Sequence, residues 1–149
     1  MKIYITRKIP EIGIKMFQDK GYEVDVNLKD RILSKKELIK ALKKKSYDGV
    51  LCLLTDKIDG DIFDAAPNAK IFANYAAGFD NIDMKAAKQR RVIVTNTPGV
   101  LSEAVAEHAV ALMLAVGRRI AESDKFIRRG LYKGWAPMLF LGDGIFGKT

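Results

Sequence analysis

The sequence predicts a doubly wound α/β fold, in which helices flank a parallel five-stranded sheet. Strand-like runs alternate five times with segments of helical periodicity in the first hundred residues, and the connections between them are short. Right-handed crossovers leave few topologies, of which the flavodoxin-like strand order 2-1-3-4-5 is the simplest. We therefore expect residues 1–100 to form one flavodoxin-like domain and residues 101–149 to form a separate, differently organised segment.

Five strands are expected from short runs rich in apolar and β-branched residues. The second run alternates apolar and polar residues with period two, which is typical of a strand exposed on one side. The third run is apolar throughout and contains the single cysteine, Cys52, which we expect to be a buried core thiol. The expected strands span residues 3–6, 22–26, 50–54, 71–73 and 92–95.

The first two helices are predicted from their start signals and periodicity. Pro10 suits the first turn of a helix in which Ile12, Met16 and Phe17 share one face, and Gly21 closes it. A capping box, Ser34-Lys35-Lys36-Glu37, starts the next helix. The buried stripe of that second helix consists of Leu38, Ile39 and Leu42.

Two shorter helices are expected further on, at residues 62–66 and 84–90, the latter with Asp83 as its N-cap. Beyond the turn 96–99, Ser102 is expected to cap a helix that runs to Val116. This helix is apolar nearly all round, so we expect it to be buried on several sides. A basic amphipathic stretch follows, up to Gly130. The apolar tail after it suggests an intersubunit arm.

The formal net charge of +8 raises the question of nucleic-acid binding, but the distribution of charge argues against it. The densest lysines, at positions 35–45, lie on the solvated face and C-terminal end of one predicted helix, with no interleaved aromatic residues for base stacking. One cysteine and one histidine cannot make a zinc site. No stretch is apolar for the roughly 18 residues of a membrane span, and no signal peptide is recognisable, so we expect a cytoplasmic protein without nucleic-acid, membrane or metal partners.

A candidate ligand site lies in the stretch 74–83, NYAAGFDNID, which follows an apolar strand and leads into a helix. Crevices form outside the carboxyl ends of parallel strands. Small residues at Ala76, Ala77 and Gly78 allow a ligand to approach the backbone, whose N–H groups can bind an anion. An ordinary strand-to-helix turn is the competing interpretation.

Two apparent motifs do not support chemistry. Residues 142–149 match both G-x-G-x-x-G and the phosphate-loop pattern, but each motif needs a helix directly after its glycines. No such helix follows, and we expect no nucleotide site there. His108 is the only histidine, and no carboxylate other than its helix neighbours is placed to orient it. We expect a packed or interface histidine rather than a general base.

Three stretches, 74–83, 94–101 and 103–107, resemble the D-isomer-specific 2-hydroxyacid dehydrogenases. The segments most like its glyoxylate/hydroxypyruvate reductase branch span residues 5–10, 134–138 and 147–149. The resemblance implies a two-domain homodimer that uses NAD or NADP as its cofactor and transfers hydride from the reduced form, NADH or NADPH, to a 2-oxo acid such as glyoxylate or hydroxypyruvate.

Residue by residue, the resemblance implies that Ala77 and Gly78 hold the substrate carboxylate through their backbone N–H groups, and that Leu54 and Thr55 wall the pocket. It places Ala77 and Val105 near the nicotinamide. Trp135 is similar to the arm residue that reaches the partner subunit's site. The homodimer would form through residues 102–146.

The family's dinucleotide-binding loop and its catalytic arginine, acidic residue and histidine have no counterpart in the sequence, so we expect no catalytic residue in this chain and no tightly bound cofactor. The expected function is the substrate-binding half of an oxidoreductase, inactive alone and either a truncated product or a separately encoded piece. Two alternatives stay open. One is a non-catalytic dimeric assembly module with weak carboxylate affinity, and the other is a regulatory small-molecule binder.

Overall fold

The computed structural model describes residues 1–147. The chain divides into two compact units, Met1–Val100 and Leu101–Thr149. The last two residues of the phosphate-loop match, Lys148 and Thr149, lie outside the described residues.

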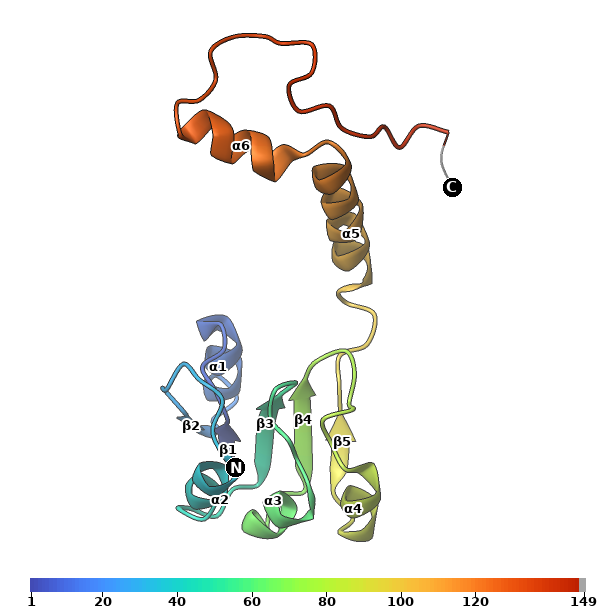
Figure 1. Cartoon of the computed structure of the whole chain (residues 1–149). Helices are drawn as coiled ribbons and strands as arrows, with labels where there is room; N and C mark the ends of the chain where they lie inside the picture. The colour runs from blue at the N-terminus through green and yellow to red at the C-terminus, as the bar shows by residue number, and fades with distance from the viewer. Residues whose placement is uncertain (148–149) are drawn as a thin grey trace. The chain divides into compact units, whose positions relative to one another are not determined.

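The first unit is built on a parallel sheet with the strand order β2-β1-β3-β4-β5, as the sequence predicted (Figure 1). Strands that follow one another in the sequence are joined through helices, so each connection is a crossover. The strands are β1 (Lys2–Ile5), β2 (Glu23–Val26), β3 (Gly49–Leu53), β4 (Ile71–Tyr75) and β5 (Ile93–Thr95).

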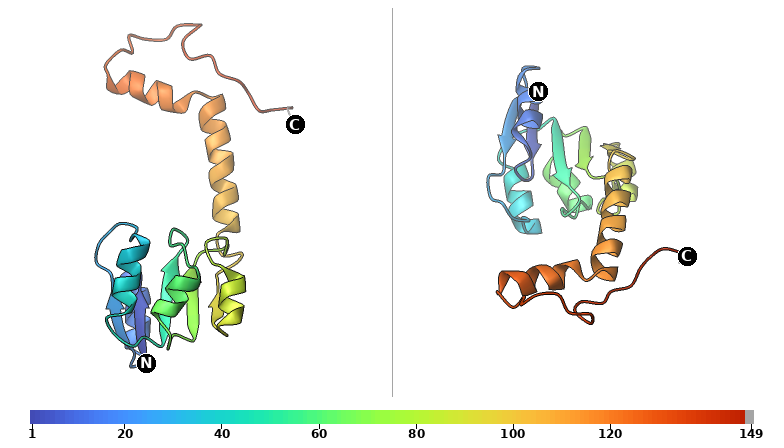
Figure 2. Two further views of the ribbon diagram at one scale, coloured as in Figure 1. Left: turned by 60° about the horizontal axis from the view of Figure 1, so that its bottom comes forward. Right: turned by 90° about the horizontal axis from the view of Figure 1, so that it is seen from above.

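Three helices cover one face of this sheet: α2 (Lys35–Leu42), α3 (Gly60–Ala65) and α4 (Met84–Gln89). Figure 2 shows them side by side in front of the strands. Their apolar side chains pack on the strand residues of that face, with Phe63 meeting Phe72 edge to face at 4.9 Å between ring centroids. This is the main hydrophobic core.

Helix α1 (Glu11–Gln18) covers the opposite face over β1 and β2. Ile14 and Phe17 pack there with the buried Ile9, whereas Ile12 and Met16 are exposed. The predicted shared face of Ile12, Met16 and Phe17 was therefore wrong. The contact with Ile9, which lies before the helix, decides which side of this two-turn helix is buried.

The helix start signals were correct for α2 and α4. Ser34 and Glu37 form the complete capping box of α2, and Asp83 accepts a hydrogen bond from the Ala86 N–H at 2.9 Å. The prediction of Ser102 as a cap was wrong, because Leu101 is the N-cap of α5 (Ser102–Gly117) and no side chain caps that helix.

The second unit begins with α5, none of whose residues is buried within the described chain. The expectation of burial on several sides is thus not met by residues 1–147. The exposed side chains include the apolar Val105, Leu112 and Val116. No helix in the described part of the chain is long and apolar enough to cross a membrane.

Helix α6 (Ile120–Arg128) and the tail pack locally within this unit. Phe140 meets Phe126 edge to face at 5.1 Å between ring centroids, and the Arg119 guanidinium lies 5.2 Å from the Phe140 centroid. A Cβ atom at Gly142 would lie 2.4 Å from the Gly117 carbonyl oxygen. This close backbone approach accounts for Gly142 without any nucleotide.

Candidate functional site

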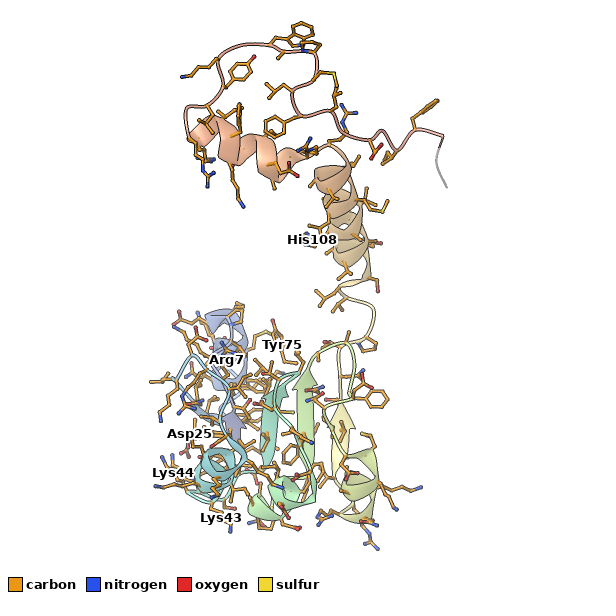
Figure 3. The ribbon with its side chains drawn as sticks, in the orientation of Figure 1. Arg7, Asp25, Lys43, Lys44, Tyr75 and His108 are labelled. Atoms are coloured by element: carbon orange, nitrogen blue, oxygen red, sulfur yellow. The ribbon has the colours of Figure 1, made fainter. Side chains whose placement is uncertain are left out.

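The candidate site lies beyond the carboxyl ends of β3 and β4. In the ladder between these strands Leu53 is paired with Tyr75, so the segments that follow the two strands start side by side. Tyr75 marks this end of β4 in Figure 3. The structure thus places the predicted wall residues, Leu54 and Thr55, next to the segment that carries Ala77 and Gly78. All four are exposed.

Hydrogen bonds hold the turn 76–79 by its carbonyl groups. The Ala76 carbonyl accepts from the Thr97 N–H at 2.9 Å, and the Ala77 carbonyl accepts from Asn96 Nδ2 at 2.7 Å. The Gly78 carbonyl accepts from Asn74 Nδ2 at 2.9 Å. Within residues 1–147, by contrast, the N–H groups of Ala77 and Gly78 donate to no acceptor. The turn therefore presents two adjacent, unused donors.

The turn does not need glycine at position 78 for its own geometry. The backbone of Gly78 has no left-handed φ, and a Cβ atom there would find Asp80 Oδ2 as its nearest neighbour, at 3.6 Å. The space beside the Gly78 Cα atom, where a side chain would stand, is therefore largely open. A glycine that the local backbone geometry does not require is often found where a ligand approaches the backbone closely.

Two asparagines join this turn to the loop after β3. Asn74 is 2% exposed and donates to both Gly78 and Asn81, with Nδ2 2.9 Å from the Asn81 Oδ1. Asn81 Nδ2 lies 2.9 Å from the Asp56 carbonyl oxygen and 3.2 Å from that of Leu53. No role was predicted for these asparagines from the sequence. Their only signal was the pair of amides on either side of a glycine turn.

A buried carboxylate closes the loop 53–56. Asp56 is 4% exposed and accepts from the Thr6 hydroxyl and, at 2.9 Å, from the Leu53 N–H. Burial, together with the charge of Asp56, raises the pKa of the Cys52 thiol to about 12. Cys52 is fully buried, which confirms its predicted place in the core and leaves it a neutral thiol.

The remaining predicted site residues belong to the second unit. Val105 and Trp135 are both exposed. His108 is exposed on α5, so residues 1–147 do not bury it (Figure 3).

A groove of about 780 Å³ lies elsewhere on the first unit, between β2 and α2. Its carboxylates are already used: Asp25 accepts from the Tyr47 hydroxyl at 2.8 Å and pairs with Lys45, and Glu37 pairs with Arg31. The Arg31 guanidinium and the Ser34 groups hold the pKa of Glu37 well below its usual range. No residue of the loops after β3 and β4 lines this groove, so it is separate from the candidate site.

The fold and the site together define a class: a flavodoxin-like α/β domain with a turn at the carboxyl ends of its strands that presents two unused N–H donors. The sequence profile of the family "D-isomer specific 2-hydroxyacid dehydrogenase, catalytic domain" matches residues 3–140. The chain belongs to this family.

Individual relatives agree with this assignment. The chain is 47% identical over 152 residues to a glyoxylate reductase of Thermococcus litoralis, covering 99% of this chain and 45% of the relative. The crystal structure of the TT0316 protein from Thermus thermophilus superposes with a TM-score of 0.87 at 38% identity, covering 96% of this chain and 45% of that one. An NAD⁺-bound 3-phosphoglycerate dehydrogenase of Entamoeba histolytica superposes with a TM-score of 0.67 at 30% identity, covering 93% and 43%. The chain thus spans about half the length of the relatives it matches.

Proposed function

We propose that the turn 76–79 binds the carboxylate of a small 2-oxo acid, such as glyoxylate or hydroxypyruvate, through the N–H groups of Ala77 and Gly78. The observation that carries this proposal is the pair of unused donors on a turn whose carbonyls are all tied back. Hydrogen bonds from N–H groups to a charged acceptor are about twice as strong as those between neutral groups. Leu54 and Thr55 would wall the pocket on the β3 side.

The chain would then be the substrate-binding half of an NAD(P)-dependent oxidoreductase that reduces the 2-oxo acid to a 2-hydroxy acid. Ala77 and Val105 would lie near the nicotinamide, and Trp135 would reach a partner subunit. The described residues do not by themselves fit a dinucleotide at Gly142, because the backbone there packs against the Gly117 carbonyl. We expect the chain to be inactive alone.

An NMR titration of the ¹⁵N-labelled chain with glyoxylate tests the binding proposal. The expected result is saturable shifts of the Ala77 and Gly78 amides, with propionaldehyde, which lacks the carboxylate, as the control. Shifts that the aldehyde reproduces would contradict carboxylate recognition. Steady-state assays with glyoxylate or hydroxypyruvate and NADH or NADPH test inactivity, and turnover by the purified chain would refute it.

A second candidate function is a non-catalytic dimeric assembly module with weak carboxylate affinity. It is favoured by the apolar side chains of α5, which no part of residues 1–147 buries. Both candidates predict a homodimer through residues 102–146. Light scattering measures the mass directly, and a monomer at all concentrations would count against the dimer in both. Binding without turnover in any reconstituted holoenzyme would favour the assembly module.

A further inference from the structure

The side chains of Asn74 and Asn81 form a reciprocal amide pair. Asn74 Nδ2 lies 2.9 Å from the Asn81 Oδ1, and Asn81 Nδ2 lies 3.3 Å from the Asn74 Oδ1. The orientation of the Asn81 amide is determined by its surroundings, because the flipped form would point its oxygen at two carbonyl oxygens.

Each member of the pair also reaches one of the two loops of the candidate site. Asn74 donates to the Gly78 carbonyl on the turn 76–79. Asn81 donates to the carbonyls of Leu53 and Asp56, which bracket the loop that carries Leu54 and Thr55. The two loops are thus linked by an unbroken chain of hydrogen bonds.

Ordered elements anchor the pair on both sides. Asn74 is a residue of β4, and its Oδ1 lies 3.6 Å from the Cys52 Sγ of the neighbouring strand. The Asn81 carbonyl accepts from the Ile58 N–H at 2.9 Å, and Ile58 and Ile82 form an isolated parallel bridge. Asn81 therefore has little freedom to leave its partner.

We propose that Asn74 and Asn81 are positioning residues that hold the carboxylate-binding turn and the pocket wall as one rigid body. The functional part of this inference rests on the proposed 2-oxo acid site. A displacement of the Ala77 and Gly78 N–H groups is transmitted to Leu54 and Thr55 through the amide pair. The same hydrogen bonds keep these N–H groups in their binding orientation before any ligand is present. Such preorganisation lowers the ordering cost of binding.

The substitution Asn81→Asp tests this role because it keeps the shape of the side chain and removes both donors. The new carboxylate faces the Leu53 and Asp56 carbonyls and repels them. The matched control is Asn68→Asp, since Asn68 is exposed and its amide donates only to the Ser46 hydroxyl, at 2.8 Å. Backbone ¹⁵N relaxation is measured without ligand, followed by a glyoxylate titration.

In the Asn81→Asp protein we expect order parameters at residues 54–55 and 77–78 to fall from about 0.85 to below about 0.6. We also expect glyoxylate affinity to fall at least tenfold, and the wild-type response of the Leu54 and Thr55 amides to disappear. The Asn68→Asp protein should match the wild type. If the pair contributed only to general stability, the substitution would lower the midpoint of unfolding but would not lower the order parameters of the two loops.

Unchanged order parameters in both loops of a folded Asn81→Asp protein would overturn the proposal. If that variant does not fold, side-chain amide exchange in the wild type decides, because the Asn74 and Asn81 NH₂ groups must exchange far more slowly than that of Asn68. Equal rates would overturn the pair. If the wild type binds no glyoxylate, the proposed function fails, while the relaxation and exchange results still decide the coupling.

Discussion

The substitution Gly78→Ala, which adds one methyl group, tests whether the glycine is needed for folding or for ligand binding. The added Cβ atom has no neighbour closer than 3.6 Å, and the residue has no left-handed φ. Because alanine restricts the unfolded chain more than glycine does, Gly78→Ala should change the free energy of unfolding by at most about +0.4 to +1 kcal/mol, in the stabilising direction.

The same methyl group should weaken binding of a carboxylate. It stands beside the Gly78 N–H and obstructs approach to a donor whose hydrogen bond to a charged group is worth about 1.5–3 kcal/mol. That loss corresponds to roughly a 10- to 150-fold weaker affinity for glyoxylate. Urea denaturation followed by circular dichroism measures the stability, and the NMR titration measures the affinity.

Gly49→Ala is the matched control. At Gly49 in β3, the added Cβ atom would lie 3.1 Å from Ile71 Cγ2 and 3.2 Å from Ile3 Cδ1. Overpacking of this kind costs typically about 1–3 kcal/mol. The two glycines should therefore give opposite results: stability lost at Gly49, and binding lost at Gly78. A Gly78→Ala protein that is destabilised by more than about 1 kcal/mol, or one that binds glyoxylate as tightly as the wild type, would refute the reasoning.

Three further predictions concern individual side chains. The pKa of Glu37 is lowered by Arg31, so the folded state favours the ionised carboxylate. The stability that this carboxylate adds is therefore present above about pH 4.3 and is lost as the pH falls. In denaturation curves, the difference in free energy of unfolding between the wild type and Glu37→Gln should shrink as the pH is lowered from about 5 to about 2. The pKa of Cys52, raised to about 12 by burial, predicts that a thiol reagent labels it far more slowly in buffer than in denaturant, and equal rates would contradict its burial. Arg90 meets Asp64 through two bonds of 2.7 Å, but Asp64 is 60% exposed, so Asp64→Asn should cost less than about 1 kcal/mol, and less still in high salt.

Much of the fold was predictable because it depends on local signals and on a general rule of chain topology. The alternation of strands and helices, with right-handed crossovers, led to the observed strand order. Ser34 and Asp83 were recognisable as caps because a cap and the backbone N–H that donates to it lie within three residues of each other.

The errors arose where distant contacts decide the outcome. The buried side of α1 is set by Ile9 and the sheet, and two turns of helix carry too little periodicity to show it. The start of α5 differed from the prediction by one residue, and helix boundaries are uncertain by that much when no side chain caps the first turn.

The location of the candidate site was predicted from the sequence, but the hydrogen bonds that hold its turn in place were not. A strand end followed by small residues pointed to the turn 76–79. The bonds that hold it reach from Asn74 to Asn81, and from Asn81 to residues 25 and 28 positions away. They depend on the register between β3 and β4, which the sequence alone does not specify.

The buried polar side chains show where the fold is most strongly constrained. Within residues 1–147 they are Thr6, Asp56 and Asn74, which lie at or just beyond the ends of β1, β3 and β4. An unpaired buried polar group costs about 1–3 kcal/mol, yet among these residues no buried side-chain nitrogen or oxygen lacks a partner. If the strands simply ended here without any further role, these polar groups could be exposed to water. Because they are instead buried and fully bonded, we infer that this end of the sheet is held in one conformation, which is what the proposed anion site would need in order to aim its two N–H groups.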